Sequence, residues 1–429
     1  MRAWAMYDWA NSAMVTTIVA AVFPIYFNNV AAANLPEGVA TQRFALATTL
    51  GLALIAVVSP VLGAVADFTA AKKRFLGGFL AVGCLATASM FFIHRGDWLL
   101  ALTLFVFANI GAAGSFVFYD SLLPHVARPN EMDRLSTSGY ALGYLGGGLL
   151  LALNLAWILK PGLFGLPAGE HLTAAQSTLP ARLAFVSVAL WWFGFSIPLL
   201  RRVPEPPGLL KSVEGLNLKT ARAAFTRIGE TVRELRSYRQ AFLMLLAFLV
   251  YNDGIGTIIR MAVIYGAGIG IGRNALIAAI VLVQFVGIPF ALIFGAIAGR
   301  IGAKRSVLIG LVVYIGISVL AFYMRTATHF FALAILVGMV QGGTQALSRS
   351  LFASMIPRHK SAEFFSFFAI AEKFAGIFGP ALFAVVIMLT GSSRNAIISV
   401  IIFFVLGGLL LLKVNEEEGR RMARAAEAP

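Results

Sequence analysis

A short pattern occurs twice in this chain, each time where a long apolar run ends. The first copy is GAVADFTAAKKR, from Gly63 to Arg74, and the second is GAIAGRIGAKRS, from Gly295 to Ser306, 232 positions later. Each copy places a glycine, small or apolar residues, a turn and a basic cluster after a segment long enough to cross a bilayer. The pattern indicates a duplicated chain, with two similar halves built from membrane-spanning helices.

The composition supports a membrane protein. Hydrophobic residues make up 59% of the 429 positions and charged residues 12%, whereas a soluble domain has about 25% charged residues. The single cysteine, Cys84, excludes an intrachain disulfide and a cysteine metal cluster. A net charge of +15 would suggest nucleic-acid binding in a soluble protein, but here the charge lies between apolar runs, so no nucleic-acid partner is expected.

Apolar runs of roughly 18 to 25 residues are expected to be membrane spans, and the chain has twelve of them. They are approximately Ala5–Phe27, Phe44–Ala66, Phe75–Phe92, Trp98–Phe118, Ser138–Trp157, Ala181–Leu200, Ala241–Tyr265, Asn274–Ala298, Ser306–Met324, Phe330–Leu347, Phe364–Leu389 and Asn395–Leu412. An even number of spans places both termini on the same side of the membrane.

The basic residues indicate which side that is. Of the 34 Lys and Arg residues, 25 lie in the terminal segments and in the loops on their side, and seven lie in the loops on the opposite side. Because cytoplasmic loops are enriched in Lys and Arg, both termini are expected in the cytoplasm, as for a multi-pass protein of a bacterial-type inner membrane.

The first run has an alternative interpretation as a cleavable signal peptide, since Arg2 precedes it and the small residues 31–33 follow it. Asp8, Asn11 and Ser12 interrupt the run, however. Cleavage would also leave eleven spans and destroy the duplication, so a first membrane span is favoured.

The span positions divide the chain into a first six-helix half at 1–200, a linker at 201–239, a second half at 240–412 and a cytoplasmic tail at 413–429. In the linker, apolar residues recur at helical spacing and basic residues occupy the other faces. The apolar ones are Leu218, Ala221, Phe225, Ile228, Val232 and Leu235. A helix lying on the anionic leaflet is favoured, and a solvated linker is the alternative.

The first copy of the repeated pattern also carries a resemblance. Gly63, Asp67, Lys72 and Lys73 resemble the loop signature between the second and third spans of the major facilitator superfamily, with Ala70 where a glycine is usual. Two parallel six-span repeats with a site between them are the plan of that superfamily. The predicted fold is therefore an all-α integral membrane protein with twelve helices in two pseudo-symmetric halves.

Whole phrases narrow the resemblance to the autophagy-related vacuolar effluxer-like family within that superfamily. They are WAMYDWANSA, FPIYF, YDSLLPHVA, YALGYLGGG, YNDGIGTII and LSRSLFASMIP. The resemblance implies amino-acid efflux from vacuoles in fungi, while many bacterial members have no assigned substrate. The short chain lacks large insertions and resembles a bacterial-type member.

Ionisable residues inside the spans are the first candidates for a solute or coupling site. Asp253 lies near the middle of the seventh span, and Arg260 follows two turns later on the same helix face. A carboxylate and a guanidinium beside a cavity suit a zwitterion such as an amino acid. The alternatives are structural pairing with neighbouring helices and, for Arg260, extension to the membrane interface.

Further candidates lie in the tenth and eleventh spans. Glu372 and Lys373 are adjacent and are expected to point in different directions, with Lys373 and Asp253 as one cross-helix pair. Either carboxylate, Asp253 or Glu372, is a candidate proton carrier, and a permanent charge network is the alternative. The uncharged candidates for ligand contact are Gln341, Gln345, Asn11 and Asn252, although most such residues hold helices together.

The loop after the second span is the candidate gate. By the superfamily resemblance, Asp67 with Lys72 and Lys73 engages the other half when the cytoplasmic side is closed. Gly299 stands at the equivalent place in the second half. A single acidic latch predicts asymmetric gating.

Patterns of enzymatic chemistry are absent from the sequence: there is no Walker motif, HExxH or G-x-S-x-G. We therefore expect no enzyme, no cofactor and no metal site. The predicted function is a monomeric secondary transporter of a small organic solute, with amino acids as the first candidate and protons as the candidate coupling ion. The alternatives are a drug or metabolite exporter, and a lipid-handling or non-transporting membrane protein.

Overall fold

The computed structural model describes residues 1–36, 39–169, 171–208, 233–374 and 378–427. Over these residues the chain is helical, without a β-strand. Twelve of the helices in these ranges are long and apolar enough to cross a membrane, and each overlaps one of the predicted spans. The predicted all-α membrane fold is confirmed.

The first half is built from long helices joined by short turns. They are α1 (Arg2–Ala13), continued by π-helical Met14–Val22, α2 (Phe23–Tyr26) and π-helical Phe27–Ala31; α3 (Val39–Thr69); α4 (Lys72–Ser89), ending in a 3₁₀ turn at Met90–Phe92; α5 (Trp98–Ser121) with the short α6 (Leu123–Val126); α7 (Met132–Leu159), followed by a 3₁₀ turn at Pro161–Phe164; and α8 (Ala174–Arg202).

The second half repeats this plan. Its helices are α10 (Arg239–Gly268), α11 (Arg273–Ile301), α12 (Ala303–Phe322), α13 (Ala327–Ser354) with a 3₁₀ turn at Arg358–Lys360, α14 (Ser361–Phe374), α15 (Phe378–Thr390), α16 (Ser393–Ser399), α17 (Ile401–Leu412) and α18 (Glu416–Ala425). The eleventh span comprises α14 and α15.

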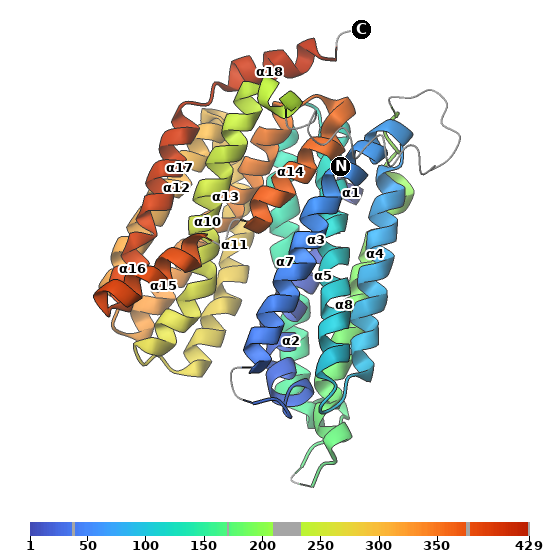
Figure 1. Cartoon of the computed structure of the whole chain (residues 1–429), viewed down its shortest axis with the longest axis vertical. Helices are drawn as coiled ribbons and strands as arrows, with labels where there is room; N and C mark the ends of the chain where they lie inside the picture. Colours follow the sequence, from blue (N-terminus) through green and yellow to red (C-terminus); the bar gives the residue numbers. More distant parts are fainter. Residues whose placement is uncertain (37–38, 170, 209–232, 375–377, 428–429) are drawn as a thin grey trace.

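The two halves stand side by side, the first coloured blue to green and the second yellow to red (Figure 1). They meet where α7 packs against α11 and α13, and where α14 packs against α3 and α5. Both termini lie toward the end of the bundle that α18 covers (Figure 1), and this is called the terminal end below. The predicted even number of crossings requires this arrangement.

Small residues let α7 approach α1 closely. A β-carbon added to Gly143 would lie 2.5 Å from the Ser12 Oγ, and one added to Gly147 would lie 3.1 Å from the Ser12 carbonyl oxygen. At Gly139 an added β-carbon would collide with the carboxylate of Asp8. Any larger residue at these positions would push the two helices apart.

Several basic residues that the charge tally placed in loops lie inside helices, with Arg349 and Arg182 among them, and this part of the tally is wrong. Arg349 belongs to α13, which runs to Ser354 rather than ending at Leu347, and its side chain is buried. Arg182 belongs to α8 and donates to the carbonyl oxygens of Phe91 and Ala175. Hydropathy ends a span at its first charge, but a helix continues when protein groups satisfy that charge.

Most of the predicted linker helix, residues 209–232, lies outside the described residues. The start of the linker is hydrogen-bonded to the start of α4. The Lys73 backbone N–H donates to Glu205 Oε2 at 2.9 Å, which satisfies an N–H group in the first turn of α4. Burial raises the pKa of the Glu205 carboxyl, while this backbone hydrogen bond lowers it.

Candidate functional site

A cavity of about 440 Å³ lies between the two halves. It is lined by α1, its π-helical continuation, α5 and α7 from the first half, and by α10 to α14 and Ile397 of α16 from the second. Its wall is mostly apolar, and the charged residues on it are Asp8, Asp120, Arg349, Glu372 and Lys373. A solute in this cavity would contact both halves at once, as alternating access requires.

Four of the predicted site residues line this cavity: Gln341, Gln345, Glu372 and Lys373. The Glu372 and Lys373 side chains are half-buried, and Lys373 Nζ lies 3.9 Å from Glu372 Oε2. The expectation that these two charges point apart is therefore wrong. On one helix the long Lys side chain spans the 100° between adjacent residues and brings its ammonium group beside the carboxylate.

The other predicted residues lie behind the cavity wall or away from it. Gln345 Nε2 donates to Asn252 Oδ1 at 3.4 Å, which places Asn252 in a second layer. Asn11 is buried within the first half and donates to the Tyr7 hydroxyl at 3.3 Å. Over the described residues the lining includes neither Asp253, which is buried in α10, nor Arg260, whose side chain is exposed.

The cavity ends, on the side of the terminal end, at a buried group that we call the arginine cluster: Asp8, Asp120, Ser136 and Arg349. Arg349 lies 3.2 Å from Asp8 Oδ2 through Nη2 and 3.0 Å from Asp120 Oδ1 through Nη1. Its Nε donates to Ser136 Oγ at 2.9 Å, and Nη2 also donates to the Ser136 carbonyl oxygen at 3.1 Å. The side chain is 2% exposed.

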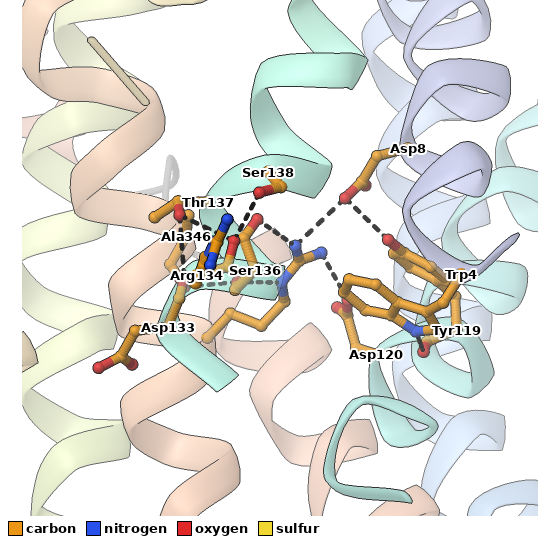
Figure 2. Close-up of polar contacts among 11 residues, drawn as sticks. Trp4, Asp8, Tyr119, Asp120, Asp133, Arg134, Ser136, Thr137, Ser138 and Ala346 are labelled. Carbon is orange, nitrogen blue, oxygen red and sulfur yellow. Dashed lines mark hydrogen bonds and ion pairs between the residues drawn. The ribbon is translucent and has the colours of Figure 1, made fainter. Parts of the chain in front are cut away.

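Every partner of Arg349 in this cluster belongs to the other half. Asp8 comes from α1, Asp120 from α5 and Ser136 from α7, whereas Arg349 comes from α13. Figure 2 shows the first three converging on one point between the helices. The Ser136 Oγ also donates to the Ala346 carbonyl oxygen at 2.7 Å. The arginine cluster therefore ties the halves together near the terminal end.

Aromatic side chains surround the cluster and hold its geometry. Trp4 stacks on Tyr119 with ring centroids 4.4 Å apart, and its Nε1 donates to the Tyr119 carbonyl oxygen at 3.0 Å. The Tyr119 hydroxyl donates to Asp8 Oδ2 at 2.8 Å. The guanidinium carbon of Arg349 lies 4.7 Å from the Tyr140 ring centre and 5.0 Å from that of Trp4, within cation–π range.

A second contact between the halves is made by the predicted gate, and we call it the α3–α14 latch. Asp67 accepts hydrogen bonds from the backbone N–H groups of Ala362 at 3.2 Å and Glu363 at 2.8 Å. These are among the first N–H groups of α14, which have no partner within the helix, and a negative charge there is favourable. Lys72 Nζ lies 2.8 Å from Asp67 Oδ1 and donates to Ser361 Oγ at 2.6 Å.

The latch contains two of the three predicted gating residues. Asp67 and Lys72 both contact the second half, as the superfamily resemblance implies. The third residue, Lys73, donates a hydrogen bond from its backbone N–H to the Glu205 carboxylate. Ala70, where the superfamily has a glycine, adopts a positive φ of 51°, a conformation that costs a residue with a β-carbon roughly 1–2 kcal/mol.

The two copies of the repeated pattern differ in their surroundings. A β-carbon on Gly63 would lie 2.5 Å from Ser366 Oγ and 2.6 Å from the Ala362 carbonyl oxygen, both in the other half. On Gly299, no atom would lie within 4 Å. The Asp67 position and its counterpart Gly299 therefore differ in their contacts, whereas Gly63 and its counterpart Gly295 both pack on the other half: a β-carbon on Gly295 would collide with the Thr137 Oγ1 of α7.

The arginine cluster was not predicted from the sequence, although its three charged residues lie in phrases that the sequence analysis quotes. Asp8 lies in WAMYDWANSA, Asp120 in YDSLLPHVA and Arg349 in LSRSLFASMIP. All three phrases carried the family resemblance. The available signal was therefore three charged residues near span ends inside the most distinctive phrases, which argues for a shared site rather than for loop positions.

Comparison with known proteins agrees with this architecture. Residues 36–424 match the family model described as "Vacuole effluxer Atg22 like". An uncharacterized MFS-type transporter of Bacillus subtilis, YxiO, is 37% identical over 417 residues, covering 97% of this chain and 95% of that protein. Autophagy-related protein 22-1 of Aspergillus niger is 28% identical over 309 residues, which cover 68% of this chain and 48% of the fungal protein.

Solved structures show the same fold at low sequence identity. The E. coli fucose:proton symporter FucP superposes with a TM-score of 0.70 at 12% identity, covering 96% of this chain and 97% of its own. The proton:xylose symporter XylE gives a TM-score of 0.69 at 15% identity, covering 97% and 95%. Both are major facilitator superfamily proteins by their fold.

Proposed function

We propose that this chain, which belongs to the Atg22-like vacuole effluxer family of the major facilitator superfamily, moves a small zwitterionic solute by alternating access. Amino acids are the first candidates. The observation that carries the proposal is the cavity between the halves, which places an acid and a base side by side in an otherwise apolar wall.

The charged pair on the cavity wall suits a zwitterion. The Lys373 ammonium group can bind a carboxylate, and Glu372 can bind an ammonium group at 3.9 Å from it. Gln341 and Gln345 on α13 offer amide donors and acceptors on the same wall. The description of the matching family model, "Vacuole effluxer Atg22 like", supports the same class of activity.

The orientation of the protein is part of the proposal. The excess of Lys and Arg on the side of the termini supports a cytoplasmic terminal end in a bacterial-type inner membrane. Because the arginine cluster and the α3–α14 latch join the halves at that end, the structure then represents a state closed to the cytoplasm.

One observation favours a second candidate, a drug or metabolite exporter. The cavity surface is predominantly apolar, with Phe116, Phe248, Phe330 and Phe368 on it. Such a wall also suits an apolar solute. The two candidates differ in whether the Glu372 and Lys373 charges are needed for binding.

The test is solute exchange in proteoliposomes. Purified protein is reconstituted, preloaded with unlabelled solute, and given labelled amino acids or a set of apolar amines and drugs outside. Rapid uptake of an amino acid supports the proposal, while uptake of apolar compounds alone favours the exporter. A folded protein that exchanges neither, or that moves only labelled lipid between leaflets, contradicts it.

A matched pair of variants ties any flux to the cavity. Lys373→Gln removes the ammonium group that faces the solute, and a zwitterion should then bind at least tenfold more weakly, since a charge-assisted hydrogen bond contributes about 1.5–3 kcal/mol. Lys413→Gln removes the same charge from an exposed position after α17 and should leave exchange unchanged. Equal exchange rates in the two variants would show that the Lys373 charge does not contribute to solute binding.

A further inference from the structure

We infer that Asp120, with Asp8 beside it, is a proton-binding site that competes with Arg349, so that a proton taken from the cavity releases the arginine cluster and opens the terminal end. The inference deepens the proposed transport function, because it assigns the coupling proton to a residue. It names a different carboxylate from Asp253 and Glu372, the two that the sequence predicts.

The cluster has one carboxylate more than it has cations. Arg349 bridges Asp8 at 3.2 Å and Asp120 at 3.0 Å, so one guanidinium holds two carboxylates that are 7% and 10% exposed. With both acids ionised, the group carries a net charge of about −1 in a site with little water. Like charges this close destabilise each other unless a cation lies between them.

The position of the cluster makes this balance depend on conformation. Both carboxylates belong to the first half, and the cation belongs to the second. When the halves separate at the terminal end, Arg349 leaves and two acids remain together without a counter-charge. A carboxylate in that position takes up a proton, because isolated charges in the membrane interior are costly.

Asp120 is the better proton acceptor of the two. Asp8 Oδ2 receives two donors, the Tyr119 hydroxyl at 2.8 Å and Arg349 Nη2 at 3.2 Å. Asp120 receives one donor from the described part of the chain, Arg349 Nη1 at 3.0 Å. After Arg349 departs, Asp8 therefore still has a hydroxyl donor that stabilises its charged form, and Asp120 has lost the donor that the structure gives it.

The surroundings of Asp120 contain few other groups that can exchange protons. Tyr119 on α5, Tyr7 on α1 and Tyr140 on α7 are phenols, which stay protonated. On α14, Glu372 lines the same cavity and adds negative charge on that side, and its neighbour Lys373 is the cation of that wall. Asp133 on α7 binds the Ser350 hydroxyl instead of the cluster.

The step conserves charge and atoms. A hydronium ion from water in the cavity transfers one proton to the Asp120 carboxylate, leaving a neutral carboxylic acid and water. The neutral acid no longer forms an ion pair with Arg349, which is left with one ion pair, to Asp8, instead of two. The halves then part more easily at the terminal end, where the proton is released. By linkage, protonation must favour the open terminal end by as much as opening favours protonation.

The test measures opening of the terminal end directly and needs no known solute. Ser350 is buried between the halves, against Asp133. In a Cys84→Ser background, Ser350→Cys is labelled in lipid vesicles with a thiol reagent over a pH series. Each rate is divided by that of an exposed Lys413→Cys reference, which cancels the intrinsic pH dependence of the thiol.

The parent protein and two variants decide the result. The normalised rate of the parent protein should rise as pH falls, by up to about tenfold per pH unit for one linked proton. Asp120→Asn, which imitates the protonated acid, should be labelled fast at every pH. Asp8→Asn leaves one acid for one cation and should keep a pH dependence displaced to lower pH.

The control is Asp67→Asn, which weakens the α3–α14 latch without touching the cluster. It should raise the rate at every pH and keep the parent slope. A parent rate that does not change with pH, or an Asp120→Asn protein with the parent slope, overturns the inference. Failure of the exchange experiment with an intact pH response would instead contradict the proposed solute and leave the proton site standing.

Discussion

Replacing Arg349 by Met should open the terminal end. The substitution keeps a long apolar stem but removes ion pairs of 3.0 and 3.2 Å and two hydrogen bonds to Ser136, all between the halves. Because the guanidinium is 2% exposed, solvent screening is small. Removing one partner of a buried ion pair costs about 3–5 kcal/mol.

The substitution destabilises the closed state alone, since the ion pairs exist only while the halves are in contact. At about 1.4 kcal/mol for each factor of ten, the open fraction should rise roughly 100- to 4,000-fold. The readout is the labelling rate of Ser350→Cys in the Cys84→Ser background. Arg300→Met is the matched control, because it removes the same charge from an exposed position at the end of α11.

An Arg349→Met protein labelled no faster than Arg300→Met would refute the reasoning. It would show that the cluster does not hold the halves together, whatever its geometry. Arg349→Lys should give an intermediate rate, because a single ammonium group cannot reproduce the fork that reaches Asp8, Asp120 and Ser136 together.

Three further changes test the closed end at other points. Asp67→Asn should raise the same labelling rate about 5- to 30-fold, because a charge at a helix N-terminus contributes roughly 1–2 kcal/mol. An unchanged rate would show that the α3–α14 latch does not hold the halves together. Gly63→Ala should prevent closure and give fast labelling, whereas Gly299→Ala should behave as the parent, and equal rates would contradict the assigned contacts. Ala70→Gly should raise thermal stability by about 1 kcal/mol by relieving its positive φ, and a lower melting temperature would count against that strain.

Much of the fold could be predicted from the sequence, because a bilayer allows few solutions. Backbone groups in hydrocarbon must bond internally, so long apolar runs become helices, and their number and loop charges follow from counting. The repeated pattern at Gly63 and Gly295 gave the two halves. The first copy also indicated a contact between the halves, since Asp67 and Lys72 contact α14 as the resemblance implies.

The arginine cluster could not be predicted by the same reasoning. A hydropathy pattern places the end of a span at Arg349, because the pattern contains no information on Asp8 and Asp120, which pair with this arginine from the other half. That meeting depends on how the halves pack, which no local pattern contains. Asp253 shows the converse: it lies near the middle of a long helix, α10, as its span suggested, but helix rotation leaves it outside the cavity lining.

The most direct measurement is a pair of distances across the halves in lipid, taken by spin labelling at each end of the bundle. Labels at Arg201 and Arg421 report on the terminal end, and labels at Leu159 and Tyr323 report on the opposite end; all four positions are exposed. On acidification or addition of a transported solute, the terminal distance should lengthen while the opposite distance shortens. Two distances that stay fixed, or that change together in the same direction, would contradict alternating access by this protein.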